Sequence, residues 1–118
     1  NIHIKEIVKL IEINKKINFI EKYKISRDLF KKLESRTDDI LVVFGSYANF
    51  SANEKSDIDL LIIGNHMEVR DLEQLYNIKI NIVKIDKMKF KKEDILIKEV
   101  IKNHIILKRV EEFIELIW

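Results

Sequence analysis

Two short apolar runs limit the folds open to this 118-residue chain more than any other feature of its sequence. Ile40–Phe44 reads ILVVF, and Ile58–Ile63 reads IDLLII. Apolar runs of this length between polar or turn-forming residues are typical of strands inside a sheet, because a buried helix needs roughly twice as many residues. The sequence therefore predicts a sheet with at least two buried strands.

Helical periodicity is found on either side of these strands. Apolar residues recur near the helical period over residues 2–22. This pattern predicts an amphipathic helix, interrupted near Asn14, that packs its apolar side on the rest of the domain. Ser26 is placed to cap a second helix that ends near Arg36. Shorter helices are expected further along the chain, over residues 69–75 and 93–103, followed by a last helix through Phe113 and Leu116.

A third strand is expected over residues 78–85, where isoleucine alternates with polar residues, and Asp86 is placed to cap the structure that follows. A brief extended segment is expected at residues 104–107. Together, these elements predict an α/β fold, more narrowly an α+β two-layer domain with a mixed sheet and flanking helices, preceded by N-terminal helices. We expect an N-terminal helical segment at residues 1–35 and one domain at residues 36–118.

The composition excludes several classes of protein. The chain contains no cysteine, which rules out disulfide frameworks and thiolate metal sites. Its formal net charge of +2 is not the footprint of a dedicated nucleic-acid binder. No apolar run approaches the roughly 18 residues of a membrane span. We therefore expect a cytoplasmic protein that does not bind a membrane and does not bind nucleic acid through this segment.

Two aspartates stand where the second apolar run begins. Side chains at positions i and i+2 of a strand point to one face, so Asp57 and Asp59 project together. Carboxylates in an apolar strand need a partner, and Mg²⁺, which prefers oxygen ligands, is a suitable one. Mg²⁺ is commonly shared with nucleotide phosphates, which Gly45 and Ser46 are placed to receive at the preceding turn. The sequence therefore predicts a site for Mg²⁺ and a triphosphate.

The residues of this site carry a resemblance to a known family. The stretch GSYANFSANEKSDID places ten residues between Ser46 and Asp57. It resembles the signature of the nucleotidyltransferase fold, a Gly-Ser pair followed by Asp-x-Asp. With FGSYA and SDIDLLI, it is similar to the minimal nucleotidyltransferase (MNT) family. The resemblance is strong over residues 40–64, weaker over the third expected strand and over KEVIKNHIILK, and absent from residues 1–35.

The resemblance implies a nucleotidyltransferase-like fold and a set of roles. Gly45 and Ser46 would hold the outer phosphates of ATP, and Asp57 and Asp59 would bind the catalytic Mg²⁺ ions. The MNT family includes the antitoxins of the HEPN/MNT toxin–antitoxin systems, which are implicated as protein adenylyltransferases. The implied function is transfer of AMP from ATP to a hydroxyl of a partner protein, such as a HEPN-type toxin.

One position departs from the family pattern. The family places a third carboxylate on the next strand, where this chain has Asn81. An amide cannot act as a base and is a poor Mg²⁺ ligand, so this residue puts turnover in doubt without removing nucleotide binding. Asp86 lies further along the same strand. Five residues of extended chain span roughly 16 Å, which is too far for Asp86 to replace the missing carboxylate.

Two further residues are candidates for nucleotide binding. Lys55 and Ser56 directly precede the aspartates. For Lys55 the alternative is an ordinary solvated loop lysine. The catalytic candidates are therefore Asp57 and Asp59, which are also the candidate metal ligands, and the three histidines stand at no ligand spacing.

Three functions remain open at this point. The first is Mg²⁺-dependent AMP transfer. The second is a nucleotide-binding module, weakened in catalysis by Asn81, that acts by occupying a toxin. The third is the effector domain of a larger DNA-binding regulator, since the chain opens at Asn1 rather than Met and carries no signature before Ser26.

Overall fold

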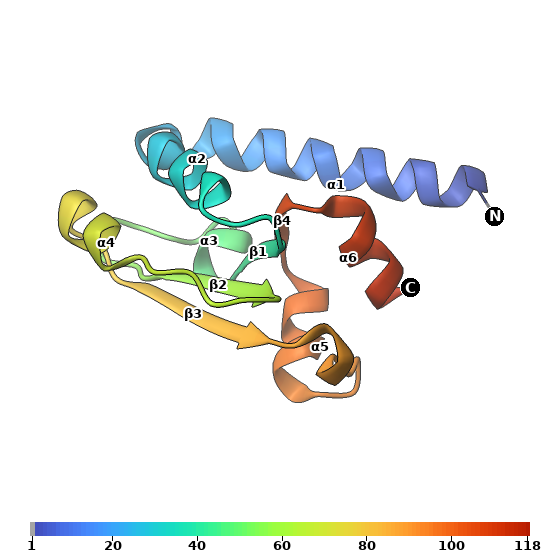
Figure 1. Ribbon diagram of the computed structural model, residues 1–118. Coiled ribbons are helices and arrows are strands. Elements are labelled where there is room, and N and C mark those ends of the chain that lie inside the picture. Colours follow the sequence, from blue (N-terminus) through green and yellow to red (C-terminus); the bar gives the residue numbers. More distant parts are fainter. Residues whose placement is uncertain (1) are drawn as a thin grey trace.

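Helices flank a four-stranded mixed sheet in the computed structural model, which describes residues 2–118 (Figure 1). Along the chain the elements are α1 (Ile2–Lys22), a 3₁₀ turn (Lys24–Ser26), α2 (Arg27–Ser35), β1 (Ile40–Phe44), α3 (Gly45–Ala48), β2 (Ile58–Ile63), α4 (Arg70–Tyr76), β3 (Ile80–Ile85), a second 3₁₀ turn (Lys87–Lys89), α5 (Ile95–Lys102), β4 (Ile105–Lys108) and α6 (Val110–Ile117). The expected fold class is confirmed. None of the helices in this described part combines the length and apolarity that a bilayer crossing needs.

The sheet has the strand order β3-β2-β1-β4. β1 pairs antiparallel with β2 and with β4, and β2 pairs parallel with β3. A parallel pair needs a crossover connection, which contains α4. In this register Asp59 stands opposite Phe44 on one side and Asn81 on the other. The end of β1 and the starts of β2 and β3 therefore lie together at one end of the sheet.

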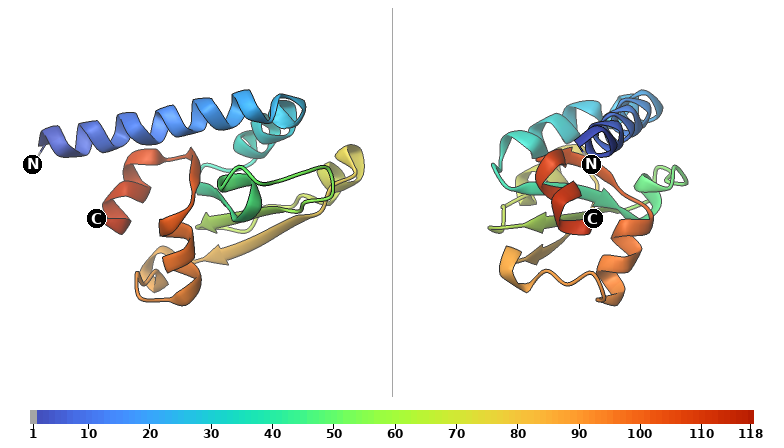
Figure 2. Two further views of the ribbon diagram at one scale, coloured as in Figure 1. Left: turned by 180° about the vertical axis from the view of Figure 1, so that it is seen from behind. Right: turned by 90° about the vertical axis from the view of Figure 1, so that its right-hand side faces the viewer.

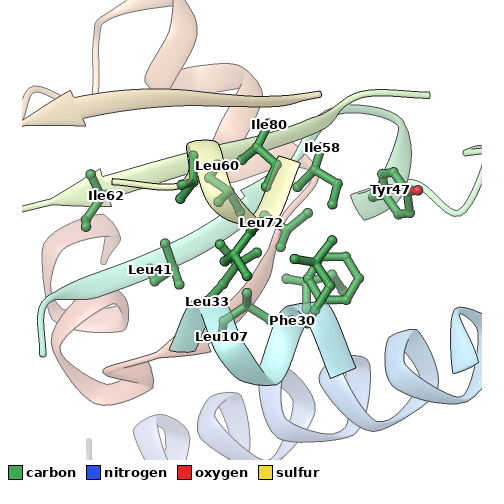
Figure 3. Close-up of a cluster of buried hydrophobic side chains, with 14 of the residues drawn as sticks. Phe30, Leu33, Leu41, Tyr47, Ile58, Leu60, Ile62, Leu72, Ile80 and Leu107 are labelled. Atoms are coloured by element: carbon green, nitrogen blue, oxygen red, sulfur yellow. The ribbon is translucent and has the colours of Figure 1, made fainter. Parts of the chain in front are cut away.

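Helices cover both faces of the sheet. The first face packs against α2, α4 and the C-terminal part of α1, and Figure 3 shows this core, which contains Leu41 and Leu60 of the sheet and Phe30 of α2. Because side chains alternate along a strand, Asp59 shares the second face with Leu61. That second face packs against α5 and α6, through Val42, Leu61, Ile63, Ile97, Val100 and Phe113.

Three local predictions differ from the structure. α1 is continuous through Asn14, because asparagine costs a helix only a fraction of a kcal/mol and no glycine or proline interrupts the segment. Ser26 occupies the N-cap position of α2, but a 3₁₀ turn precedes the helix and the side chain makes no capping hydrogen bond. Asp86 likewise caps nothing through its side chain. The aspartate that caps is Asp94, whose Oδ1 accepts the N–H of Leu96 at 2.9 Å.

α1 does not pack through the apolar side that its periodicity predicts. Its buried side chains are Glu12 and Phe19, whereas Ile7, Leu10 and Ile17 remain 56%, 66% and 55% exposed. The prediction that the apolar side faces the domain is therefore wrong for most of its residues, although Val8 and Ile20 pack against the two cores. The inward face carries polar groups that find partners on the domain, and Phe19 anchors its C-terminal end.

Candidate active site

Asp57, Asp59 and Asn81 meet at one end of the sheet, on its second face. Asp57 directly precedes β2, Asp59 lies within it, and Asn81 lies opposite Asp59 on the parallel neighbour β3. Nδ2 of Asn81 donates to Asp59 Oδ1 at 3.0 Å and to Asp57 Oδ2 at 3.3 Å. All three residues are half-buried, so each remains partly open to solvent. The structure thus joins the two candidate metal ligands to the residue at the doubtful third position.

Gly45 shapes the space in which the carboxylate of Asp59 lies. Its φ of +71° is a conformation that residues with a Cβ rarely adopt. A Cβ on Gly45 would also lie 2.3 Å from Oδ2 of Asp59. Glycine is therefore required twice, for the turn out of β1 and for the close approach of the aspartate.

α3 starts at this same turn, directly after β1. The first N–H groups of a helix have no partner within it and favour anions such as phosphate. Ser46 lies in this first turn and is half-buried, while Tyr47 is buried in the core of the first face. The buried tyrosine holds α3 in place, so Gly45 and Ser46 present their backbone beside the carboxylate of Asp59.

Lys55 and Ser56 lie in the loop between α3 and β2. Oγ of Ser56 accepts the N–H of Asn53 at 2.9 Å, and the backbone N–H of Lys55 donates to Oδ1 of Asn53 at 2.8 Å. These bonds close a tight turn just before Asp57. The side chain of Lys55 is exposed. A part for either residue in nucleotide binding stays a prediction.

A cleft of about 290 Å³ opens beside Gly45. Sequence reasoning missed two of its polar residues, Asn49 and Lys102, because neither belongs to the Gly-Ser or Asp-x-Asp motif. The available signal was the stretch KEVIKNHIILK, which contains Lys102. Lys102 ends α5, shortly before β4, and β4 pairs with β1. This pairing brings the lysine close to the turn at Gly45, where phosphates are expected. The lining consists of Phe44, Gly45, Asn49, Glu99, Lys102 and Asn103.

The donor set at this site fits one divalent cation. Mg²⁺ is typically held by one or two carboxylates together with water and substrate phosphates, and Asp57 and Asp59 supply such a pair. Among residues 2–118, no group of three or more His, Cys, Asp or Glu side chains is placed to share a metal ion. Asn81 supplies no carboxylate and hydrogen-bonds both aspartates.

Asp86 does not join this group. It follows the opposite end of β3, where its Oδ1 lies 2.8 Å from Nζ of Lys84. Its hydrogen bond with Lys84 holds the pKa of this carboxyl below its ordinary value. Asp86 therefore serves a local surface ion pair, and the strand separates it from the site, as the sequence predicts.

Comparison with known proteins places the chain in a family. A search of curated proteins finds no match. The sequence profile described as nucleotidyltransferase domain matches residues 22–116, which contain the whole sheet and the whole candidate site. α1 precedes the matched segment except for its last residue. Since the match covers most of the chain and contains the site described above, the chain belongs to the nucleotidyltransferase domain family.

Proposed function

We propose that this domain binds ATP with Mg²⁺ and transfers AMP to a hydroxyl group of a partner protein, so that the hydroxyl oxygen bonds the α-phosphorus, the bond between the α- and β-phosphates breaks, and pyrophosphate and the hydroxyl proton are released. Membership in the nucleotidyltransferase domain family supports nucleotidyl transfer as the general chemistry and a nucleotide as the substrate. The observation that carries the proposal is the convergence of Asp57 and Asp59 through Asn81, with Asp59 next to Gly45, which also lines a cleft together with Lys102 and Glu99.

Each residue of the site has a stated part in this proposal. Asp57 and Asp59 would hold the cation, and the backbone at Gly45 and Ser46 would receive the outer phosphates. Lys102 would place a positive charge against the same phosphates. A divalent cation, when bound, offsets phosphate charge and polarises the phosphoryl group under attack.

The size of the cleft favours an acceptor on another macromolecule. A space of about 290 Å³ lies just below the usual volumes of small-molecule pockets, which run from about 300 to 1,000 Å³. A triphosphate would occupy most of it, which leaves no enclosed room for a second small substrate. A hydroxyl presented from outside, on a protein such as the HEPN-type toxin that the MNT resemblance implies, meets this constraint.

Asn81 favours a second candidate, a nucleotide-binding module with little turnover. An amide cannot take the proton of an attacking hydroxyl, so the chain lacks a base at the position where the family pattern has a carboxylate. Such a module would act by occupying its partner, or as the effector domain of a larger DNA-binding regulator. Both candidates share the binding step and differ only in transfer.

Two measurements test the proposal. Binding to the native state raises stability by mass action, by about 2.7 kcal/mol at a hundredfold excess over Kd. The melting temperature should therefore rise with Mg²⁺ and ATP together and not with ATP plus a chelator. Equal melting under both conditions would contradict the site itself.

Transfer is then measured with ATP labelled at the α-phosphate and, in a parallel reaction, at the γ-phosphate. Covalent labelling of a partner protein by the α-label alone supports AMP transfer. Ligand-dependent stabilisation without any labelling favours the binding module.

A further inference from the structure

α1 presents an apolar surface to solvent along most of its length. This surface, named here the outer face of α1, consists of Ile4, Ile7, Leu10, Ile11, Ile13 and Ile17, which are between 39% and 66% exposed. Single exposed apolar residues are ordinary, but six on one side of one helix form a contiguous patch. Figures 1 and 2 show α1 along the outside of the domain, with no element covering its outer side.

The helix cannot roll to bury this face without losing buried polar contacts. On its inner side, Glu12 lies 2.7 Å from Nε2 of His104, and both residues are 6% exposed. Lys16 donates to Glu34 at 2.8 Å and to the carbonyl of Leu107 at 3.0 Å. A rotation of α1 would separate these groups and expose Phe19, so the outer face is held outward.

The spacing on the outer face is that of a helix that pairs with another helix. Ile7, Leu10, Asn14 and Ile17 follow one another at intervals of three, four and three residues, which matches the a and d spacing of a heptad over this short stretch, and His3 and Glu21 stand at the next such positions on either side. Asn14 takes an a position between apolar d residues. A single asparagine at an a position pairs with its own copy and sets the register of a two-stranded coiled coil.

We propose that the outer face of α1 is a homodimer interface, in which α1 packs against α1 of a second copy of this chain. Its exposed apolar area is on the order of 600 Å² per copy, so two copies would bury roughly 1,200 Å², the lower limit of a stable specific interface. The low net charge of +2 allows two copies to approach without strong repulsion. We expect a reversible dimer with a micromolar Kd.

Charge disfavours a lipid surface as the occupant. Helices that lie on membranes carry lysine and arginine beside their apolar face, and these attract anionic headgroups. α1 also carries five lysines, of which Lys9, Lys15 and Lys16 are held in ion pairs with Glu111, Glu12 and Glu34. By helical spacing, Glu6 and Glu21 lie on the outer side of α1, where they would repel such headgroups. The proposed interface also contains no residue of the candidate site, because α1 packs on the edge strand β4 and on α6, whereas Asp59 lies on β2.

The test is the mass of the full chain in solution, measured by sedimentation equilibrium over a range of concentrations. The wild-type chain should associate to a dimer. Leu10→Lys combined with Ile17→Lys should sediment as a monomer, with unchanged circular dichroism and an unchanged melting shift with Mg²⁺ and ATP. Leu75 on α4 is also 66% exposed, so Leu75→Lys is a matched control that should leave the dimer intact.

A second variant tests the pairing of the helices. Asn14→Leu should tighten association and favour assemblies larger than a dimer, because the polar pair that limits the number of strands is lost. A wild-type chain that stays monomeric, with or without binding to vesicles of anionic phospholipid, overturns the proposal. So does a dimer that survives the double lysine variant, or an Asn14→Leu variant with unchanged association.

Discussion

Two polar clusters in this molecule look similar and have opposite consequences. Glu12, Lys15 and His104 meet between α1 and the start of β4, and Asp57, Asp59 and Asn81 meet at the end of the sheet. Each joins residues that are distant in sequence. The first is largely buried and contains groups of both signs. The second is half-buried and contains two negative charges with only an amide between them.

The charges of the first cluster are paired with one another. Oε1 of Glu12 lies 2.6 Å from Nζ of Lys15 as an ion pair, although it accepts no well-aligned hydrogen bond, and Oε2 lies 2.7 Å from His104. Nδ1 of the histidine lies 2.9 Å from the carbonyl of Val100. This cluster therefore attaches α1 to the domain, and its charges are balanced without a bound ion.

The second cluster leaves a charge unbalanced. Nδ2 of Asn81 donates to both aspartates, which positions them but supplies no positive charge. A bound cation would supply the positive charge that no residue of this cluster provides. Charge balance, rather than the presence of acidic residues, therefore distinguishes the structural cluster from the candidate binding site. Four predictions test or sharpen this contrast.

The largest effect is expected when the amide of the second cluster becomes a carboxylate. Asn81→Asp adds a metal ligand and a possible base at little steric cost, so AMP transfer should rise by roughly 10² to 10⁴-fold. Without a metal ion the same variant should lose about 1–3 kcal/mol of stability, because a donor to two carboxylates is replaced by a third carboxylate. Label transfer and urea unfolding measure the two effects. If neither label transfer nor the free energy of unfolding changed, Asn81 would have no part in the site.

Removing the acidic member of the first cluster should cost stability alone. Glu12→Ala leaves His104 and Lys15 without their buried partner, and loss of one side of a buried pair typically costs about 3–5 kcal/mol. Urea unfolding measures the loss. Glu21→Ala, on the exposed side of the same helix, is the control and should change little. Equal losses in the two variants would mean that the cluster does not hold α1.

Removing an acidic member of the second cluster should cost binding alone. Asp57→Asn or Asp59→Asn should abolish the stabilisation by Mg²⁺ and ATP, about 2.7 kcal/mol at a hundredfold excess over Kd. The ligand-free protein should be as stable as the wild type or more so, since two like charges no longer repel. Asp86→Asn, directly after β3 and outside the site, should keep the full shift. An unfolded Asp57→Asn or Asp59→Asn protein would show that the pair is structural.

The smallest effect concerns pH. Burial disfavours the charged form of Glu12, but its interactions with His104 and Lys15 outweigh burial and hold its pKa below the ordinary value. A carboxyl with a lowered pKa in the folded state contributes stability that is present above its unfolded pKa and lost as pH falls through the folded value. Unfolding free energy should therefore decline below about pH 4.5, and less steeply in Glu12→Gln. Parallel profiles would assign the acid sensitivity to other groups.

The local sequence pattern was sufficient to predict the central strands of the fold and the central residues of the candidate site. The runs at residues 40–44 and 58–63 predict their strands because a short apolar run bounded by polar residues needs no distant information. The shared face of Asp57 and Asp59 follows from the alternation of side chains along a strand. The Gly-Ser turn follows from the conformational freedom that only Gly45 has at this point.

Features that depend on a partner distant in the sequence were decided by the tertiary structure alone. Lys102 lines the cleft at Gly45 only because β4 pairs with β1. Periodicity shows that α1 has an apolar side, yet it cannot show which side faces the domain. The structure turns that side outward, because Glu12 finds His104 92 residues away and Phe19 finds the core. Such a contact contributes to stability only when both partners are in place, so it cannot be predicted from a single stretch of sequence.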